Sequence, residues 1–319
     1  MTNKEKYLEF VRLEKLPIYM HPFWLDSVCE GNQQWDVLLY EKGGEIWSSF
    51  VYVVTKKYGF TLIHMPKLTQ FLGPYIKYPK GQKYYKKLSW EKEVMNYFID
   101  NLPKFDYFNM NFSYNITNWL PFYWRGFNQT TRYTYVIEKK LDLETLSKTF
   151  ETDIRRRRRR KANNIGVEVY ESQDIKKFYD LNKMTFFRQE IEIPYSFEFI
   201  ENLYYKCREN NVIKMFFAKD KYGEIIAGNF LVYDENSVYY LMGGINPNKK
   251  DLGGMDVVLY ESIKFANKSD KVFDFEGSMK ESIEKYFRSF GAVQKPLFNI
   301  FKINSKIFKV KNCLKEILK

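Results

Sequence analysis

Two acidic residues near the carboxyl terminus have the spacing of a catalytic pair. Asp274 and Glu276 lie in the run Val-Phe-Asp-Phe-Glu-Gly-Ser, where alternation predicts a strand with both carboxylates on one face and the phenylalanines toward the core. Such a pair can act as a general base or bind an amine. An ordinary salt bridge with neighbouring basic residues remains the alternative. In the following turn, Tyr-Phe-Arg-Ser-Phe-Gly, Arg288 is a candidate for stabilising an oxyanion or a substrate carboxylate.

Two glycine pairs flank a polar loop upstream of these acids. Gly243 and Gly244 end a strand-like run, and Gly253 and Gly254 lead into an amphipathic helix. Glycines before a helix let main-chain N–H groups approach an anion, which the helix N-terminus favours. The four glycines are therefore candidates for binding the phosphates of a donor molecule. The alternative is that both pairs form turns or caps without any ligand.

Six consecutive arginines begin at Arg155 in a segment that predicts a helix ended by Gly166. A run of like charges usually forms a solvated surface. The alternative is that one face, with Arg155, Arg158 and Arg159, lines a groove for phosphates, because guanidinium groups bind phosphate through two hydrogen bonds.

Several other residues are weaker candidates. Arg188 lies in a predicted helix, and the neighbouring Tyr239 and Tyr240 lie in a predicted strand; all three are candidates for contacting a substrate. The two histidines, His21 and His64, lie in or beside apolar runs, so we expect structural roles for them. A His-based triad or metal site is not expected, and neither is a bound cofactor.

The composition predicts a globular protein with an affinity for anions. The chain has 319 residues, 19% of them aromatic, and 51 Lys and Arg against 39 Asp and Glu, a formal net charge of +12. No apolar run approaches the ~18–20 residues of a membrane span, and the amino terminus lacks the apolar core of a signal peptide. Three widely separated cysteines argue against a disulfide framework. We therefore expect a soluble, cytoplasmic protein.

Two sequence patterns occur twice in the same order. Residues 36–53 and 214–233 each read as a β-hairpin with Gly-Glu-Ile at the turn. Residues 123–127 (Tyr-Trp-Arg-Gly-Phe) resemble residues 286–290 (Tyr-Phe-Arg-Ser-Phe). Two matches in the same order predict a tandem duplication.

The intervening segments predict the same architecture in each half. Helical patterns at 83–102 and 255–267 each precede a strand-like segment, at 105–112 and 272–276. Each half thus reads as an α+β unit with a mixed sheet. The polar stretch near 138–152 predicts a boundary between domains at 1–145 and 146–319.

The carboxyl-terminal segment 302–319 predicts a basic amphipathic helix. Ile307, Val310, Leu314 and Ile317 have helical spacing, and lysines occupy much of the remaining surface. Docking on the domain is the default expectation. The alternative is peripheral contact with an anionic bilayer, where a lipid-linked substrate would be found.

Five segments together resemble the Fem-type branch of the GNAT acyltransferase superfamily: RRRRRRKANNIGVEV, YYLMGGINP, DFEGSM, YFRSFGA and, earlier in the chain, LTQFLGP. The resemblance implies two GNAT-like domains and transfer of an acyl or aminoacyl group to an amine. It also implies that Arg288 stands where these enzymes carry a lysine proposed as an electrostatic catalyst. Tyr239 or Tyr240 stands where a tyrosine contacts substrate in similar proteins.

Three functions are consistent with these observations. The leading one is acyl or aminoacyl transfer to an amine of a cell-envelope precursor, from peptidoglycan or polysaccharide synthesis, with aminoacyl-tRNA or acyl-CoA as donor. The second is acetyl-CoA-dependent N-acetylation. The third is a non-catalytic RNA-binding module on a degenerate transferase fold. The partners expected are a phosphate-bearing small molecule or lipid-linked precursor and tRNA, at the inner face of the membrane.

Overall fold

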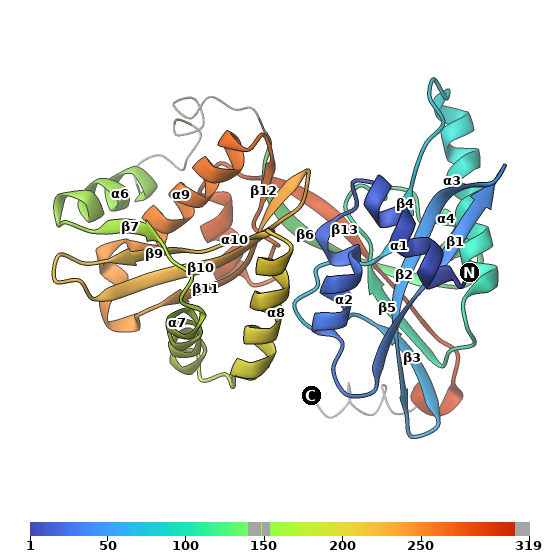
Figure 1. Ribbon diagram of the computed structural model, residues 1–319, viewed down its shortest axis with the longest axis horizontal. Coiled ribbons are helices and arrows are strands. Elements are labelled where there is room, and N and C mark those ends of the chain that lie inside the picture. The colour runs from blue at the N-terminus through green and yellow to red at the C-terminus, as the bar shows by residue number, and fades with distance from the viewer. Residues whose placement is uncertain (140–147, 149–153, 310–319) are drawn as a thin grey trace. The chain divides into compact units, whose positions relative to one another are not determined.

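The computed structural model describes residues 1–139, 148 and 154–309, and the chain forms two compact units (Figure 1). Unit 1 comprises Met1–Arg132 and Pro296–Lys319, and unit 2 comprises Tyr133–Lys295. This division differs from the predicted domains at 1–145 and 146–319, because the last strand of each repeat pairs outside its own repeat. Among the described residues, no helix is long and apolar enough to cross a membrane.

Unit 1 is built on a mixed sheet with the order β1-β2-β3-β5-β13, and β4 pairs with a separate part of β2. β3 and β5 run parallel, and the other pairs are antiparallel. The strands are β1 (Gln33–Lys42), β2 (Glu45–Lys57), β3 (Phe60–His64), β4 (Gly73–Ile76), β5 (Tyr107–Asn111) and, from Pro296, β13 (Val293–Ile303). The helices are α1 (Asn3–Leu13), η1 (Ile18–Met20), α2 (Pro22–Val28), α3 (Tyr84–Asn101) and α4 (Leu120–Trp124).

Unit 2 contains mixed strands in the order β6-β12-β11-β10-β9-β7, and β8 pairs with β10. β11 and β12 run parallel, and the other pairs are antiparallel. The strands are β6 (Asn128–Ile137), β7 (Glu168–Glu171), β8 (Ile213–Lys214), β9 (Phe216–Lys219), β10 (Ile225–Tyr233), β11 (Ser237–Ile245) and β12 (Val272–Asp274). The helices are α6 (Ile154–Asn164), α7 (Ile175–Arg188), α8 (Phe197–Glu209), η2 (Pro247–Leu252), α9 (Gly254–Lys268) and α10 (Glu281–Arg288).

The two units repeat one pattern of strands, so the α+β class with a mixed sheet is confirmed. In unit 1, β1, β2, β3, β5 and β13 follow each other in the sheet with the same senses as β9, β10, β11, β12 and β6 in unit 2. Both predicted hairpins are present, and their turns contain Gly44 and Gly223 with positive φ, a conformation that glycine adopts readily. The duplication predicted from the sequence is therefore visible in the backbone.

The fifth strand of each unit is contributed by the other repeat. β6 follows α4 of the first repeat but pairs with β12, and β13 follows α10 of the second repeat but pairs with β5. The carboxyl-terminal segment consequently begins as strand: Lys302 and Ile303 belong to β13 rather than to the predicted amphipathic helix. A helical turn follows at residues 306–309, and residues 310–319 lie outside the described part of the chain.

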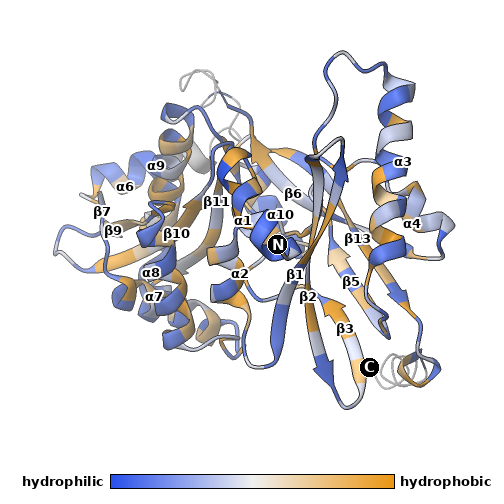
Figure 2. Ribbon diagram, turned by 45° about the vertical axis from the view of Figure 1, so that its right-hand side comes forward, coloured by the Kyte–Doolittle hydropathy of each residue, from blue (hydrophilic) through white to orange (hydrophobic). Residues whose placement is uncertain are grey.

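Aromatic side chains fill the core of each unit. In Figure 2 apolar residues, drawn in orange, are frequent in the strands and on the helix faces that cover them. Phe127 and Phe290, the last residues of the two repeated pentads, are both buried, at 3% and 1% exposed. Phe290 packs with Phe275 and Phe287 between β12 and α10. Burying a phenylalanine contributes roughly 2–3 kcal/mol, so the pentads anchor the helix after the fourth strand in both repeats.

Candidate active site

The two parallel strands of unit 2 separate shortly after they begin to pair. β11 and β12 are paired from Ser237↔Val272 to Tyr239↔Asp274. β12 then ends, while β11 continues. β11 has a bulge at Leu241, since its neighbours Tyr240 and Met242 pair with Leu231 and Phe230, respectively. A bulge bends a strand and redirects its side chains. The predicted acidic pair therefore lies where β12 ends, next to the part of β11 that no longer pairs with β12.

Asp274 and Glu276 lie together at this point, in a turn of fixed geometry. Asp274 is fully buried, and its Oδ1 accepts hydrogen bonds from the Thr134 hydroxyl and from the main-chain N–H of Glu276, the latter at 2.7 Å. Glu276 has a φ of +60°, so the predicted alternation continues through Phe275 and stops at Glu276. Gly277 follows with a φ of +68°, and a Cβ there would lie 2.0 Å from the carbonyl oxygen of Tyr133. The turn therefore requires glycine.

The carboxyl group of Glu276 is withdrawn from water. Although parts of the residue are accessible, Oε1 is buried, and no group among the described residues hydrogen-bonds to it. Burial raises the pKa of Glu276 well above its usual range. A buried carboxyl group with a raised pKa holds a proton more firmly than an exposed one, which suits a group that accepts a proton during a reaction.

Thr134 is a site residue that the sequence analysis missed. It lies on β6, the strand contributed by the first repeat, and it is fully buried. Its hydroxyl holds Asp274 in place, and Asp274 in turn holds the turn at Glu276. No motif surrounds Thr134, and its contact with Asp274 spans 140 positions, so only the pairing of β6 with β12 reveals it.

The two predicted tyrosines point to opposite sides of the sheet, as neighbours on a strand do. The hydroxyl of Tyr239 donates to Asp234 at 2.9 Å, and the residue is buried. Tyr240 packs against Phe287, and its hydroxyl lies 3.7 Å from Sδ of Met255. Burial raises the pKa of Tyr240 well above its usual value. Tyr239 shares a face with Asp274, whereas Tyr240 faces α9 and α10.

Three of the four predicted phosphate-binding glycines have packing roles in the structure. A Cβ on Gly243 would lie 1.8 Å from the Tyr240 hydroxyl, one on Gly244 would lie 2.6 Å from the main-chain nitrogen of Asn182, and one on Gly254 would lie 2.8 Å from Ile226. Gly253 and Gly254 are both buried at the start of α9. The glycines thus allow close approach of neighbouring elements, and phosphate binding by them remains a prediction.

Helix α7 occupies the main-chain groups at the end of β11. The side-chain amide of Asn182 donates to the carbonyl oxygen of Gly243 at 2.7 Å, and the main-chain N–H of Ile245 donates to the Thr185 hydroxyl at 2.9 Å. The hydroxyl of Tyr195 holds the amide of Asn182 through a 2.8 Å bond. These polar residues, which the sequence analysis also missed, leave fewer main-chain groups of β11 available to a substrate.

Arg288 ends α10 and is held by a neighbouring acid. Its Nε donates to Glu284 at 2.9 Å, and the same carboxylate accepts the hydroxyl of Tyr135 at 3.2 Å. Tyr135 follows Thr134 on β6, so its side chain lies on the opposite face of the strand. Arg288 is 58% exposed. The structure therefore places Asp274 and Glu276 together, whereas Arg288 lies on the other side of the sheet from Asp274.

The remaining predicted substrate-binding arginines lie on two other helices. Arg155 and Arg158 are on α6, and their side chains lie outside the described part of the structure. The guanidinium of Arg159 lies 3.8 Å from the ring centroid of Tyr260 on α9, a cation–π contact that fastens α6 to the unit. Arg188 is exposed at the end of α7. The predicted end of α6 is confirmed, since Gly166 follows it with a φ of +79°.

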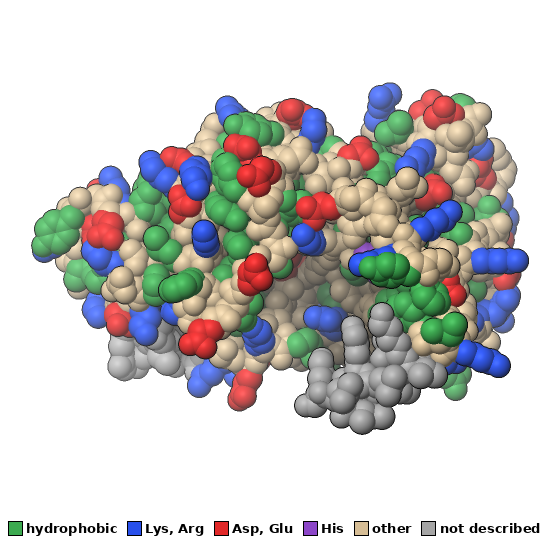
Figure 3. Space-filling view, turned by 90° about the horizontal axis from the view of Figure 1, so that it is seen from below, with side chains coloured by type: hydrophobic (Ala, Val, Ile, Leu, Met, Phe, Trp, Pro, Cys, Tyr) green, Lys and Arg blue, Asp and Glu red, His purple; other side chains and the backbone are tan. Residues whose placement is uncertain are grey.

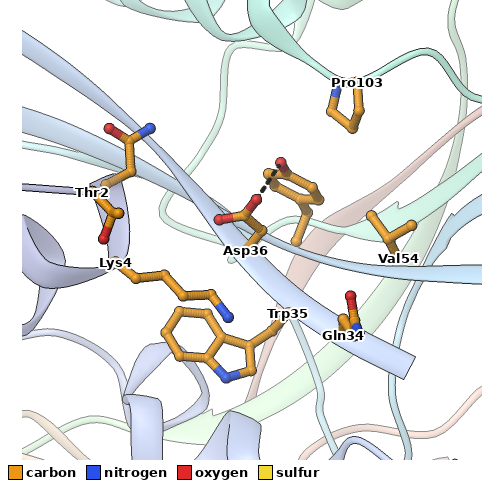
Figure 4. Close-up of a pocket in the computed structure, with 9 residues that line it drawn as sticks. Thr2, Lys4, Gln34, Trp35, Asp36, Val54 and Pro103 are labelled. Atoms are coloured by element: carbon orange, nitrogen blue, oxygen red, sulfur yellow. Dashed lines mark hydrogen bonds between the residues drawn. The ribbon is translucent and has the colours of Figure 1, made fainter. Parts of the chain in front are cut away.

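Unit 1 has a pocket of about 550 Å³ beside the start of α1 and the edge strand β1 (Figure 4). Asp36 lies in it and accepts hydrogen bonds from the Tyr52 hydroxyl at 3.3 Å and from the N–H of Val37 at 2.8 Å. The ammonium of Lys4 lies 4.1 Å from the ring centroid of Trp35. These polar groups engage each other, and the predicted site residues all belong to unit 2.

Comparisons with known proteins agree with this fold. The acetyltransferase (GNAT) domain model matches residues 148–286. The structure is similar to the crystal structure of FemX, with a TM-score of 0.69 and 14% identity over 93% of this chain and 96% of that one. It is also similar to L-PGS from Bacillus licheniformis, with a TM-score of 0.55 and 11% identity over 97% and 94%. Comparison with curated proteins found no match.

The class that the fold defines is therefore a GNAT fold, and the part of the chain that matches the GNAT domain model lies in unit 2. Over nearly the whole chain, the fold is similar to that of FemX, in agreement with the resemblance to Fem-type proteins that the motifs predict.

Proposed function

We propose that the protein transfers an acyl or aminoacyl group to an amine, with Glu276 as the general base. The observation that carries the proposal is the buried carboxyl group of Glu276, with its raised pKa, at the divergence of β11 and β12. The GNAT domain in residues 148–286 supports acyl transfer as the type of reaction. Asp274 acts as a positioning residue, because it binds Thr134 and the main chain of Glu276.

The reaction forms a C–N bond between the amine and the carbonyl carbon of the donor, and it breaks the carbonyl's bond to the leaving oxygen or sulfur. The proton lost by the amine passes to the Glu276 carboxylate and then to the leaving atom, so charge and protons balance. Arg288 lies across the sheet from Asp274, so the positive charge that it supplies while the carbonyl oxygen is negative acts from a distance. Its exposure weakens that contribution by solvent screening.

We infer that an aminoacyl-tRNA ester, rather than acyl-CoA, is the donor. A pyrophosphate at the start of α9 would meet buried glycines and the carboxylate of Asp256 in the first helical turn. Lys249, one of the two lysines in η2 before this helix, is bound at 2.7 Å by both Asp220 and Glu224, which raise its pKa. These features disfavour an anion at that helix terminus.

The acceptor proposed is the amine of a phosphate-bearing precursor of the cell envelope, from peptidoglycan or polysaccharide synthesis. The support is the similarity of the fold to that of FemX over nearly the whole chain, together with the Fem-type motifs. Incubating the protein with such precursors and each donor class should produce the mass increase of the transferred group. A mass increase with acetyl-CoA alone would favour N-acetylation instead.

The substitution Glu276→Gln tests the proposed base. Glutamine keeps the shape and loses the proton acceptor, so turnover should fall on the order of a hundredfold or more while the protein stays folded. The matched control is Glu281→Gln, which removes an exposed carboxylate from the nearby α10 and should leave turnover unchanged. Equal turnover in the wild type and the Glu276→Gln variant would remove Glu276 from the mechanism.

Thermal unfolding tests the donor separately. A ligand that binds the folded state raises the unfolding temperature. We expect a shift with aminoacyl-tRNA and none with CoA. A shift with CoA alone would reverse the donor assignment without affecting the role of Glu276.

A further inference from the structure

Helices α3 and α4 of unit 1 present large apolar side chains to solvent. Tyr84 is 73% exposed and Tyr85 59% on α3, and Tyr123 is 59% and Trp124 54% exposed on α4. Two leucines add to them, so that this region, here named the α3/α4 surface, comprises Tyr84, Tyr85, Leu88, Leu120, Tyr123 and Trp124. Exposed apolar residues that gather in one place commonly mark an interaction site.

Spacing and contacts make this surface continuous. Tyr84, Leu88 and Lys92 are four residues apart and lie on one face of α3. The ammonium of Lys92 lies 5.0 Å from the ring centroid of Trp124, which joins that face to α4. In Figures 1 and 2, α3 stands along one edge of unit 1, and the turn before it projects at its amino-terminal end.

Lysines accompany the apolar residues without paired acids. Lys83, Lys86 and Lys92 are exposed, and within the described residues none of them forms an ion pair. By contrast, basic and acidic side chains are interspersed over the face of the molecule in Figure 3. The α3/α4 surface therefore combines exposed aromatic and aliphatic groups with uncompensated positive charge.

The stability of the helix does not account for these lysines. Lys83 is the N-cap residue of α3, Lys86 and Lys87 follow in its first turn, and that turn contains no acidic residue. Positive charge at a helix N-terminus opposes the helix dipole and is unfavourable. An anionic partner would offset both this repulsion and the exposure of the tyrosines and Trp124.

We propose that the α3/α4 surface docks on an anionic membrane. Tyrosine and tryptophan favour the bilayer interface, and each lysine near an anionic surface adds on the order of 1 kcal/mol. A single-stranded nucleic acid fits less well, because Leu88 and Leu120 offer no ring for stacking. Lys86 and Lys92 also lie over the rings of Tyr85 and Trp124. The proposal goes beyond the transfer reaction, and either one can fail alone.

Sedimentation of the full chain with lipid vesicles tests this docking. The wild type should bind vesicles of phosphatidylcholine that contain phosphatidylglycerol, bind pure phosphatidylcholine less, and lose binding as salt rises. The double variant Lys86→Gln/Lys92→Gln should lower partitioning on the order of tenfold. A second variant, Tyr84→Gln/Leu88→Gln, should weaken binding even at low salt, because it removes apolar contact.

A matched lysine–tyrosine pair in unit 2 provides the control. Lys221 lies 5.0 Å from the ring centroid of Tyr222, and both are exposed, but they belong to a β-hairpin outside the α3/α4 surface. Lys221→Gln/Tyr222→Gln should bind vesicles as the wild type does. Undiminished binding by both α3 variants would overturn the proposal. So would wild-type binding to single-stranded RNA but not to vesicles, with the RNA binding lost in those variants.

Discussion

Unit 1 and unit 2 repeat one fold, but they differ where the third and fourth strands separate. In unit 2, β11 continues to Ile245 after its last pair with β12. In unit 1, β3 ends at His64, which forms its last pair with β5, at Asn109. The longer β11 gives unit 2 a stretch of strand beside the end of β12. The same strand pattern therefore supports a candidate site in unit 2, whereas in unit 1 the third strand ends at its last pair.

The residues at the equivalent points differ in the same direction. The strand pairs align Asn109 of unit 1 with Asp274 of unit 2, and two residues later Asn111 aligns with Glu276. The amide of Asn299 on β13 donates to Oδ1 of Asn109 at 2.8 Å and to Oδ1 of Asn111 at 2.9 Å. Amides do not titrate, so unit 1 has a hydrogen-bonded cluster where unit 2 has two carboxyl groups.

The largest expected effect is a pH-dependent difference in stability. Because burial raises the pKa of Glu276, the folded protein retains a proton that the unfolded chain releases above about pH 4.5. The free energy of unfolding of the wild type therefore falls as pH rises from that point toward the raised pKa. Glu276→Gln lacks this titration, so denaturant unfolding should show that the stability of the variant relative to the wild type rises with pH above about pH 4.5.

Unit 1 supplies the control for this prediction. Asn111→Ala should change the free energy of unfolding by the same amount at every pH, because an amide does not ionise. If the free energies of unfolding of the Glu276→Gln variant and the wild type differed by the same amount at every pH, the burial of the Glu276 carboxyl group would be contradicted. The two units would then not differ in how their stability depends on pH.

The next effect concerns the residues that hold each cluster together. Asp274→Ala removes the acceptor of both the Thr134 hydroxyl and the Glu276 N–H, so it should lower the free energy of unfolding by about 1–3 kcal/mol. Asp274→Asn keeps one acceptor oxygen and should cost less. Asn299→Ala in unit 1 should have a similar cost, since it strips the donor from Asn109 and Asn111.

Turnover separates the two units in this experiment. Asp274→Ala should also reduce turnover, because Asp274 positions Glu276, whereas Asn299→Ala should leave turnover unchanged in protein that remains folded. If Asp274→Ala and Asn299→Ala lowered turnover to the same degree, the Asp274 cluster would have no role in turnover that the Asn299 cluster lacks.

The sequence was sufficient for features encoded locally. Alternation and turn glycines predicted both hairpins, and the repeated pentads predicted the duplication, because each depends on residues close together in the chain. The acidic pair was recognisable for the same reason. Phe273 and Phe275 do face the core, as alternation requires, although the turn at Glu276 ends the pattern one residue after Phe275.

Features that depend on distant pairing were beyond the sequence. The exchange of β6 and β13 moves the domain boundary and brings Thr134 to Asp274, but the local pattern of a strand does not specify its partner. The packing role of Gly244 was beyond the sequence for a similar reason: the contact that requires glycine there is with Asn182 on α7, far away in the chain. A glycine pair looks the same in sequence whether it receives a phosphate or a helix.

The smallest effect compares the arginines at the same position of the two pentads. Arg125 binds Asp100 at 2.7 Å and Arg288 binds Glu284 at 2.9 Å, and both arginines are largely exposed. Exposed ion pairs contribute little, so Arg125→Ala and Arg288→Ala should each change stability by less than about 1 kcal/mol. If Arg288 also stabilises the oxyanion, Arg288→Ala should reduce turnover by roughly tenfold, less than for a donor in a dry site, and Arg288→Lys should retain part of it.

Arg125→Ala should leave turnover unchanged, because unit 1 has amides where unit 2 has the acidic pair. Equal turnover in the two alanine variants would reduce Arg288 to the structural role that Arg125 already has. Glu276 would then be the group that distinguishes the repeats chemically. A loss confined to Arg288→Ala would instead mean that the duplicated turn acquired a second use in unit 2, where the strands diverge.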